Sequence, residues 1–148
     1  MILFGGTYNH TIDAKGRVNI PAPMRKQLTG DNADQVWVTK GLQQGCVFVY
    51  PHANWELRMQ QLAALPPTEE NAIITRMFSM NSFRAELDAQ GRIVIPPQHQ
   101  QDAGFAAGVA KEVVIVGVKD RIEIWNPPAH EQYLSQYQES YQKMVRTF

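Results

Sequence analysis

The sequence is poor in the features that mark several large classes of protein. It contains a single cysteine, Cys46, which excludes an internal disulfide framework and favours a reducing cytosol. No apolar run approaches the ~20 residues that a membrane helix needs. The apolar start of the chain lacks the basic region of a signal peptide. We therefore expect a cytoplasmic protein of ordinary globular composition with no membrane partner.

Motifs for catalysis and for cofactor binding are also missing. The four histidines show no metal-ligand spacing. The sequence has no Walker loop, no G-x-S-x-G turn and no arrangement typical of an activated nucleophile. We therefore predict that the protein is not an enzyme, that it needs no cofactor or metal, and that it has no small-molecule substrate.

An excess of charge is absent from the whole chain but not from its parts. The 14 basic and 14 acidic residues give a formal net charge of zero, which on average argues against a strongly basic nucleic-acid binder. Residues 1–30, however, carry a net charge of +3, whereas residues 31–82 sum to −2 and residues 83–126 to −1. The positive charge is therefore concentrated around the stretch "DAKGRVNIP".

That stretch is one copy of an internal repeat. "DAKGRVNIP" begins at Asp13, and "DAQGRIVIP" begins at Asp88, 75 residues later. At the same offset, "GCVFVYPHANWE" from Gly45 lies over "DRIEIWNPPAHE" from Asp120. Self-similarity of this extent predicts two copies of one supersecondary unit.

Each copy has the pattern of strand, turn, strand, short segment and two further strands. Helical spacing follows the first copy, with Thr68 as an expected N-cap, and returns after the second copy as an amphipathic tail. We predict an α+β fold with two tandem β-hairpin/barrel units in a pseudo-twofold arrangement. The predicted boundaries are 7–54 for unit 1, 55–82 for a helical connector, 83–126 for unit 2 and 127–148 for a C-terminal amphipathic helix.

The repeated phrase reads as a tight hairpin. Asp13 and Arg17 would close a three-residue loop in which Gly16 takes the position that requires a positive φ. Asp13 can accept hydrogen bonds from the loop N–H groups and can pair with Arg17 across the strands. The second copy repeats these residue types. We expect four structural turn residues: Asp13, Gly16, Asp88 and Gly91.

The cations of the two copies are candidates for contact with DNA. Arginine suits bidentate contacts with guanine edges or phosphates, and Lys15 at the turn apex has the position of a phosphate contact. Arg25 and Lys26 are equally consistent with a solvated helix face. The predicted DNA-binding residues are Lys15, Arg17, Arg25, Lys26 and Arg92.

Two D-x-x-x-R phrases at this spacing, each followed by a hydrophobic residue, one other residue and Ile-Pro, resemble the MraZ family. That family belongs to the AbrB-like, swapped-hairpin superfamily of transcription factors. The resemblance implies an AbrB-like unit in each half and a nucleoid-associated protein that binds double-stranded DNA. It also implies regulation of the bacterial division and cell-wall gene cluster through tandem promoter repeats, by a homo-oligomeric ring.

The second copy departs from the family pattern. It has Gln90 in place of Lys15 and Glu86 in place of Thr11, and its segment "PPQHQQDAG" contains no Lys or Arg. We therefore hypothesise that the first hairpin dominates DNA affinity, whereas the second mainly completes the fold or the ring.

An alternative function belongs to the interaction class. The chain would then be an oligomeric protein-interaction or assembly module without direct DNA readout. The amphipathic tail, with Tyr133, Tyr137 and Tyr141, would dock on the helices of its own chain or on a neighbouring protomer. A steep salt dependence of DNA binding would favour the first function over this one.

Overall fold

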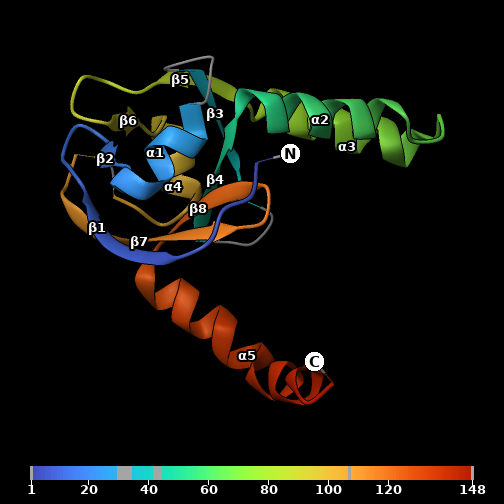
Figure 1. Cartoon of the computed structure of the whole chain (residues 1–148). Coiled ribbons are helices and arrows are strands. Elements are labelled where there is room, and N and C mark those ends of the chain that lie inside the picture. The colour runs from blue at the N-terminus through green and yellow to red at the C-terminus, as the bar shows by residue number, and fades with distance from the viewer. Residues whose placement is uncertain (1, 30–34, 42–44, 107, 148) are drawn as a thin grey trace.

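The two halves of the chain build one antiparallel sheet (Figure 1). The computed structural model describes residues 2–29, 35–41, 45–106 and 108–147. The strands are β1 (Thr7–Ile12), β2 (Arg17–Asn19), β3 (Gln35–Lys40), β4 (Cys46–Pro51), β5 (Phe83–Glu86), β6 (Arg92–Val94), β7 (Lys111–Val118) and β8 (Arg121–Trp125). The helices are α1 (Ala22–Thr29), α2 (His52–Ala63), α3 (Glu69–Met80), α4 (Pro97–Asp102) and α5 (Pro127–Val145).

The sheet is nearly closed into a barrel. Its strand order is β5-β3-β4-β8-β7-β1-β2-β6. The two end strands, β5 and β6, are consecutive in the chain and are joined by the second hairpin turn. The first strand of each half pairs with the third strand of the other half, because β1 pairs with β7 and β5 pairs with β3. Each hairpin is therefore exchanged onto the opposite half of the chain.

Two ladders show the pseudo-twofold relation directly. The β2–β6 ladder is centred on Val18 opposite Ile93, and the β4–β8 ladder includes Phe48 opposite Glu123. Both are pairs of repeat-equivalent residues, 75 apart in the sequence. The predicted α+β fold with two tandem units in pseudo-twofold arrangement is confirmed. The unit boundaries at 7–54 and 83–126 stay a prediction, because strands from both halves interleave in the sheet.

The hydrophobic core fills the inside of this sheet. The alternation of apolar residues along β2 and β6 turns one side chain in two inward, as the pleat requires. Val18, Ile20, Ile93 and Ile95 are completely buried as a result. α1 adds Met24 and Leu28 to the same cluster, and the segment after α4 adds Ala103 and Phe105.

A second apolar cluster lies on the outside of the sheet and anchors the long helices. Trp37 on β3 stacks on Trp55 of α2 with ring centroids 3.7 Å apart, and Trp125 at the end of β8 stacks on Tyr133 of α5 at 5.3 Å. Both sets of aromatic residues belong to one cluster around β4. The helices that cover the outside of the sheet are therefore attached to it by aromatic packing.

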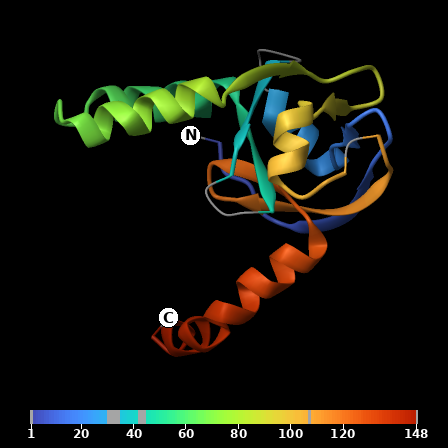
Figure 2. The same cartoon turned by 180° about the vertical axis from the view of Figure 1, so that it is seen from behind.

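The long helices α2, α3 and α5 leave the barrel as two separate projections (Figures 1 and 2). α2 and α3 form an antiparallel arm, and the N-cap expected at Thr68 is confirmed because its hydroxyl accepts the Asn71 N–H at 3.2 Å. α5 confirms the predicted tail helix and extends away from the barrel on its own.

Candidate nucleic-acid interface

The first hairpin turn is held by the Asp13 carboxylate. Its Oδ1 accepts the backbone N–H groups of Lys15 and Arg17, each at 2.9 Å, and its Oδ2 accepts the Arg17 Nε–H at 2.6 Å. Gly16 has a φ of +78°, the left-handed region that favours glycine. The backbone hydrogen bond from Arg17, together with the contacts from its side chain and from Lys15, lowers the pKa of the Asp13 carboxyl.

The second hairpin turn repeats this geometry. Asp88 Oδ1 accepts the N–H groups of Gln90 and Arg92 at 2.9 Å, and Oδ2 accepts the Arg92 Nε–H at 2.8 Å. Gly91 has a φ of +77°. The backbone hydrogen bond from Arg92 is again the largest cause of a lowered pKa, here for Asp88. The two phrases therefore build the same turn, with an apex cation only in the first.

The β2–β6 ladder brings both arginines to one surface. Arg17 lies opposite Val94, and Arg92 lies opposite Asn19. Residues that face each other across an antiparallel ladder point to the same side, and Val18 and Ile93 take the inward side. The four outward positions, which we call the paired-hairpin face, are Arg17, Asn19, Arg92 and Val94.

The spacing on this face follows from the register. Arg17 and Arg92 are diagonal neighbours in the ladder, so their Cα atoms lie about 8 Å apart. Each arginine pairs with its aspartate through Nε. In the part of the chain that the structure describes, neither arginine uses its terminal Nη groups in a hydrogen bond or ion pair. Both therefore keep a two-donor fork for a ligand, with the aspartate fixing the plane of the guanidinium group.

Arg25 is placed differently from the other predicted cations. Its Nε donates to the Ile20 carbonyl at 2.7 Å, and its Nη2 donates to Asn19 Oδ1 at 3.3 Å. Its side chain also lies against Gly91 of the second hairpin. Arg25 therefore borders the paired-hairpin face while it holds the first half against the second.

The repeat-equivalent residue of Arg25 is Gln100 on α4, which makes the corresponding contacts. Its Nε2 donates to the Ile95 carbonyl at 2.7 Å, and its amide lies against Gly16 of the first hairpin. Sequence analysis missed both contacts. The two helix positions are 75 residues apart, which is the offset of the repeat, and this relation indicates that they occupy equivalent places in the two halves.

The two lysines among the predicted site residues are exposed. Lys15 is at the apex of the first turn, and Lys26 is in the last turn of α1. Gln90 has the position of Lys15 in the second turn and is also exposed. Among the predicted cations, Lys15 therefore lies at the first turn and Arg25 lies against Gly91 of the second, and the paired-hairpin face brings Arg17 and Arg92 together.

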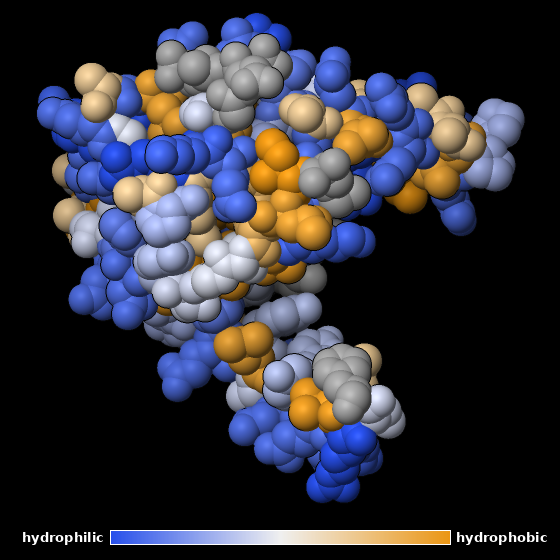
Figure 3. Space-filling model, viewed as in Figure 1, coloured by the Kyte–Doolittle hydropathy of each residue, from blue (hydrophilic) through white to orange (hydrophobic). Residues whose placement is uncertain are grey.

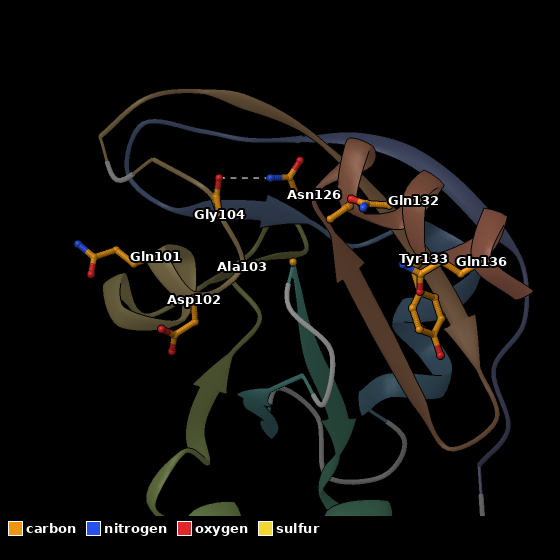
Figure 4. Close-up of a pocket in the computed structure, with 10 residues that line it drawn as sticks. Gln101, Asp102, Ala103, Gly104, Asn126, Gln132, Tyr133 and Gln136 are labelled. Carbon is orange, nitrogen blue, oxygen red and sulfur yellow. Dashed lines mark hydrogen bonds between the residues drawn. The ribbon is translucent and has the colours of Figure 1, made fainter.

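Two hollows lie elsewhere on the surface. One, of about 700 Å³, separates α4 from the start of α5; four of its ten lining residues are amides, and Asn126 Nδ2 donates to the Gly104 carbonyl at 3.3 Å (Figure 4). Its ionisable lining residues are Asp102 and Tyr133. The other lies between the α2–α3 arm and the sheet and is largely apolar.

The described residues contain no group of three or more His, Cys, Asp and Glu side chains placed to hold a metal ion. None of their helices combines the length and the apolar character that crossing a membrane would take.

Comparison with known proteins gives a family match over both halves. Residues 3–76 and again residues 77–147 match the family described as "MraZ protein, putative antitoxin-like". A protein of Lactobacillus delbrueckii subsp. bulgaricus named "Transcriptional regulator MraZ" is 41% identical over 144 residues, covering 97% of this chain and 94% of that protein. Proteins of the same name from Carboxydothermus hydrogenoformans and Lachnoclostridium phytofermentans are 39% and 42% identical, covering 97% and 84% of this chain and 94% and 82% of their own lengths.

Among solved structures, similarity was found to "The solution structure of PHS018 from pyrococcus horikoshii". The TM-score is 0.35 and the sequence identity 18%, over 86% of this chain and 98% of that one.

Proposed function

Because the chain belongs to the MraZ family of transcriptional regulators, we propose that it binds specific DNA sequences through the paired-hairpin face. Its target is the set of tandem short repeats in the promoter of the bacterial division and cell-wall gene cluster. It acts in the cytoplasm, associated with the nucleoid, as a ring-shaped homo-oligomer. The observation that carries this proposal is the presence of two arginine forks on one antiparallel ladder.

An antiparallel pair of strands has the dimensions to enter the major groove of B-DNA. The outward positions of β2 and β6 supply side chains suited to base edges. Arg17 and Arg92 can each contact O6 and N7 of guanine with two donors, and Asn19, opposite Arg92, can pair with adenine. Lys15 and Lys26 are suited to phosphate oxygens on either side.

One protomer supplies too few phosphate contacts for tight binding at physiological salt. Residues 1–30 carry a net charge of only +3, and each neutralised phosphate contributes separately to the salt-dependent affinity. A symmetric oligomer repeats the same face at fixed spacing, so that binding of one copy raises the effective concentration of the next. DNA with several regularly spaced repeats should therefore bind much more tightly than DNA with one.

The two hairpins contribute unequally in this proposal. The first turn has Lys15 at its apex, whereas the second has Gln90 at its apex and Glu86 on the preceding strand. The acidic side chain lowers the local positive potential at the second turn. Arg17 is therefore the main anchor, and Arg92 has a smaller share.

The test compares Arg17→Ala with Arg92→Ala on DNA from upstream of the protein's own gene, by fluorescence anisotropy. We expect Arg17→Ala to raise the Kd about 30-fold, or ~2 kcal/mol, and Arg92→Ala to raise it several-fold less. Lys143→Ala on α5 is the control, because it removes one positive charge far from the face. Equal losses would contradict the asymmetry, and unchanged binding in both variants would contradict the interface.

The second candidate function is an assembly module without DNA readout. The exposed apolar residues of α3 and α5 favour it. A salt titration separates the two functions, because phosphate contacts give a steep fall of affinity with salt. No binding to the repeat DNA even at low salt would favour the assembly module.

A further inference from the structure

α5 packs on the sheet near its start, where Tyr133 stacks on Trp125, and no other helix of the described residues lies along the rest of it. None of its 19 residues is buried. Its four most exposed large hydrophobic residues are Leu134, Tyr137, Tyr141 and Met144, between 53% and 66% exposed. Their spacing of three and four residues places them along one side of the helix. An apolar stripe on a helix that extends into solvent indicates a surface for association.

The pseudo-twofold relation shows what α5 lacks. α2 follows β4 and α5 follows β8, so the two helices are repeat-equivalent. On α2, Met59 and Leu62 are half-buried beside α3, and the Ser79 hydroxyl lies 3.9 Å from the Met59 sulfur. The equivalent residues 75 positions later are Leu134 and Tyr137, which are both more than half exposed. In the described residues, α2 thus has α3 beside it, whereas no helix lies beside α5 in the same way.

A matching apolar surface lies on the α2–α3 arm. Ile73, Ile74, Met77 and Met80 of α3 are between 49% and 69% exposed and follow the same helical spacing. Several of them line the hollow of about 470 Å³ between the arm and the sheet. Figure 3 shows hydrophobic residues gathered on this arm and on α5. We call these four residues the α3 face, and the four exposed residues of α5 the α5 stripe.

The two surfaces lie at opposite ends of the same ladder. β4 pairs with β8 so that Cys46 is opposite Trp125 and Val49 is opposite Ile122. The arm begins after Pro51 at one end of this ladder, and α5 begins after Trp125 at the other. Each chain therefore has the α5 stripe and the α3 face at different places on its surface. When unlike surfaces pair in one direction only between two copies, the contact is heterologous, and it closes into a ring when the rotation between copies permits.

We propose that the α5 stripe of one protomer docks on the α3 face of a second copy, head to tail. This inference rests on the homo-oligomer of the proposed function and names the surface that makes it. Pairing of two α5 stripes would leave the α3 face exposed, whereas head-to-tail docking covers both. In this type of contact, an amphipathic helix lies in an apolar groove and contacts it through side chains three and four residues apart.

The size of the contact favours a closed assembly over an open pair. Four half-exposed side chains on each helix bury on the order of 400 Å² per partner, about half of what a standard stable interface buries. A protomer in a ring uses both of its surfaces, which doubles the area that holds it. A single head-to-tail pair should therefore be weak, and the closed ring should be the stable form.

The test is complementation between two full-length variants, with mass measured by light scattering after gel filtration. One variant carries Leu134→Glu and Tyr137→Glu, and the other carries Ile73→Glu and Met77→Glu. The control, Ser135→Glu with Gln142→Glu, adds the same charges to α5 outside the stripe. Circular dichroism and thermal unfolding establish that each variant is folded before its mass is interpreted.

We expect the wild type and the control to be larger than a dimer, and each stripe or face variant alone to be a monomer of 16.8 kDa. An equimolar mixture of the two variants should contain dimers, because one stripe and one face remain intact between them. Retention of the wild-type mass by either variant, or a mixture without dimers at high concentration, would overturn the inference.

The same experiment separates the inference from the function on which it rests. If the wild type and the variants are all oligomeric, the proposed α5–α3 interface is wrong, but the proposed ring and DNA binding are not contradicted. If the wild type is a monomer, both the interface and the ring are wrong. The stripe variant should still bind DNA carrying one repeat within about twofold of wild type, because the paired-hairpin face is intact.

Discussion

The two hairpins have the same backbone and different chemistry. In both, an aspartate accepts two backbone N–H groups at 2.9 Å and an arginine Nε–H, and a glycine takes a φ of +77° or +78°. The apex residue is Lys15 in the first and Gln90 in the second. The turn residues therefore determine the backbone conformation of the turn, and the residues between them can differ in function.

The two halves also differ in the side chain with which each contacts the hairpin turn of the other half. Arg25 and Gln100 both bind the carbonyl that follows their own strand and both lie on the glycine of the opposite turn. Gln100 is buried, at 5% exposure, whereas Arg25 is half-buried and borders the paired-hairpin face. The first half thus uses a charged group for a contact that the second half makes with a neutral one.

Substitution of the two turn glycines should separate the halves by stability. A methyl group at either position is strained by the positive φ, which costs about 1–2 kcal/mol. At Gly16 it also meets the buried Gln100 amide, whereas at Gly91 it meets the half-buried Arg25 side chain, which has more room to shift. We expect Gly16→Ala to lower the free energy of unfolding by about 3 kcal/mol and Gly91→Ala by about 1–2 kcal/mol, as measured by urea unfolding.

A matched control is available at Gly108. It also has a positive φ, of +81°, but among the described residues other than its chain neighbours no atom lies within 4 Å of an added Cβ. Gly108→Ala should therefore report the conformational strain alone. If Gly16→Ala is no more destabilising than Gly108→Ala, the Gln100 contact contributes nothing to the difference between the hairpins.

The sequence was sufficient to predict what is local. Alternation along the strands, the Thr68 cap and the Asp-to-Gly spacing each depend on residues within a few positions of one another. The repeat also predicted the pseudo-twofold relation, because two similar units can pack symmetrically about a twofold axis. These features account for the fold class, and the ladder pairs Val18–Ile93 and Phe48–Glu123 confirm it.

The contacts between halves were beyond local patterns. Nothing near Arg17 indicates that Arg92 lies on the same face, because that depends on the register of a ladder between strands 75 residues apart. Arg25 reads as a solvated cation on an amphipathic helix, and only the packed structure places it on Gly91. The tail was correctly predicted to be amphipathic, but helical periodicity does not identify what covers its apolar side.

Exchange of the apex residues should sharpen the comparison in DNA binding. Lys15→Gln should weaken binding to DNA with a single repeat by about threefold and lower the salt slope by about 1, because one phosphate contact is lost. Since the two turns have the same backbone, Gln90→Lys should strengthen binding by a similar factor. The double exchange should then be close to wild type in a salt titration followed by anisotropy.

The result for Gln90→Lys is the informative one. No gain in affinity would mean that the second turn does not lie against the DNA, so that position and not charge makes the hairpins unequal. A gain would mean that the second half has kept the geometry of a DNA contact and lost only the cation.

The smallest expected difference between the hairpins is in acid stability. The backbone N–H of Arg17 for Asp13, and that of Arg92 for Asp88, is the largest cause of a lowered carboxyl pKa. A carboxyl with a lower pKa when folded binds fewer protons in the folded state, so stability rises with pH across its titration. The contribution is fully present above the unfolded value of about 3.9 and is lost as the pH falls through the lowered folded pKa.

Asp13→Asn and Asp88→Asn should each reduce this pH dependence of the free energy of unfolding below pH ~4, and by equal amounts. Urea unfolding at a series of pH values measures it, and the double variant should show the sum of the two effects. Equality is expected because each carboxylate accepts the same three hydrogen bonds, and Lys15 contributes through its backbone N–H as Gln90 does. A larger effect at Asp13 would show that the Lys15 ammonium also acts on the turn. The first hairpin would then differ from the second in its stability as well as in its ligand.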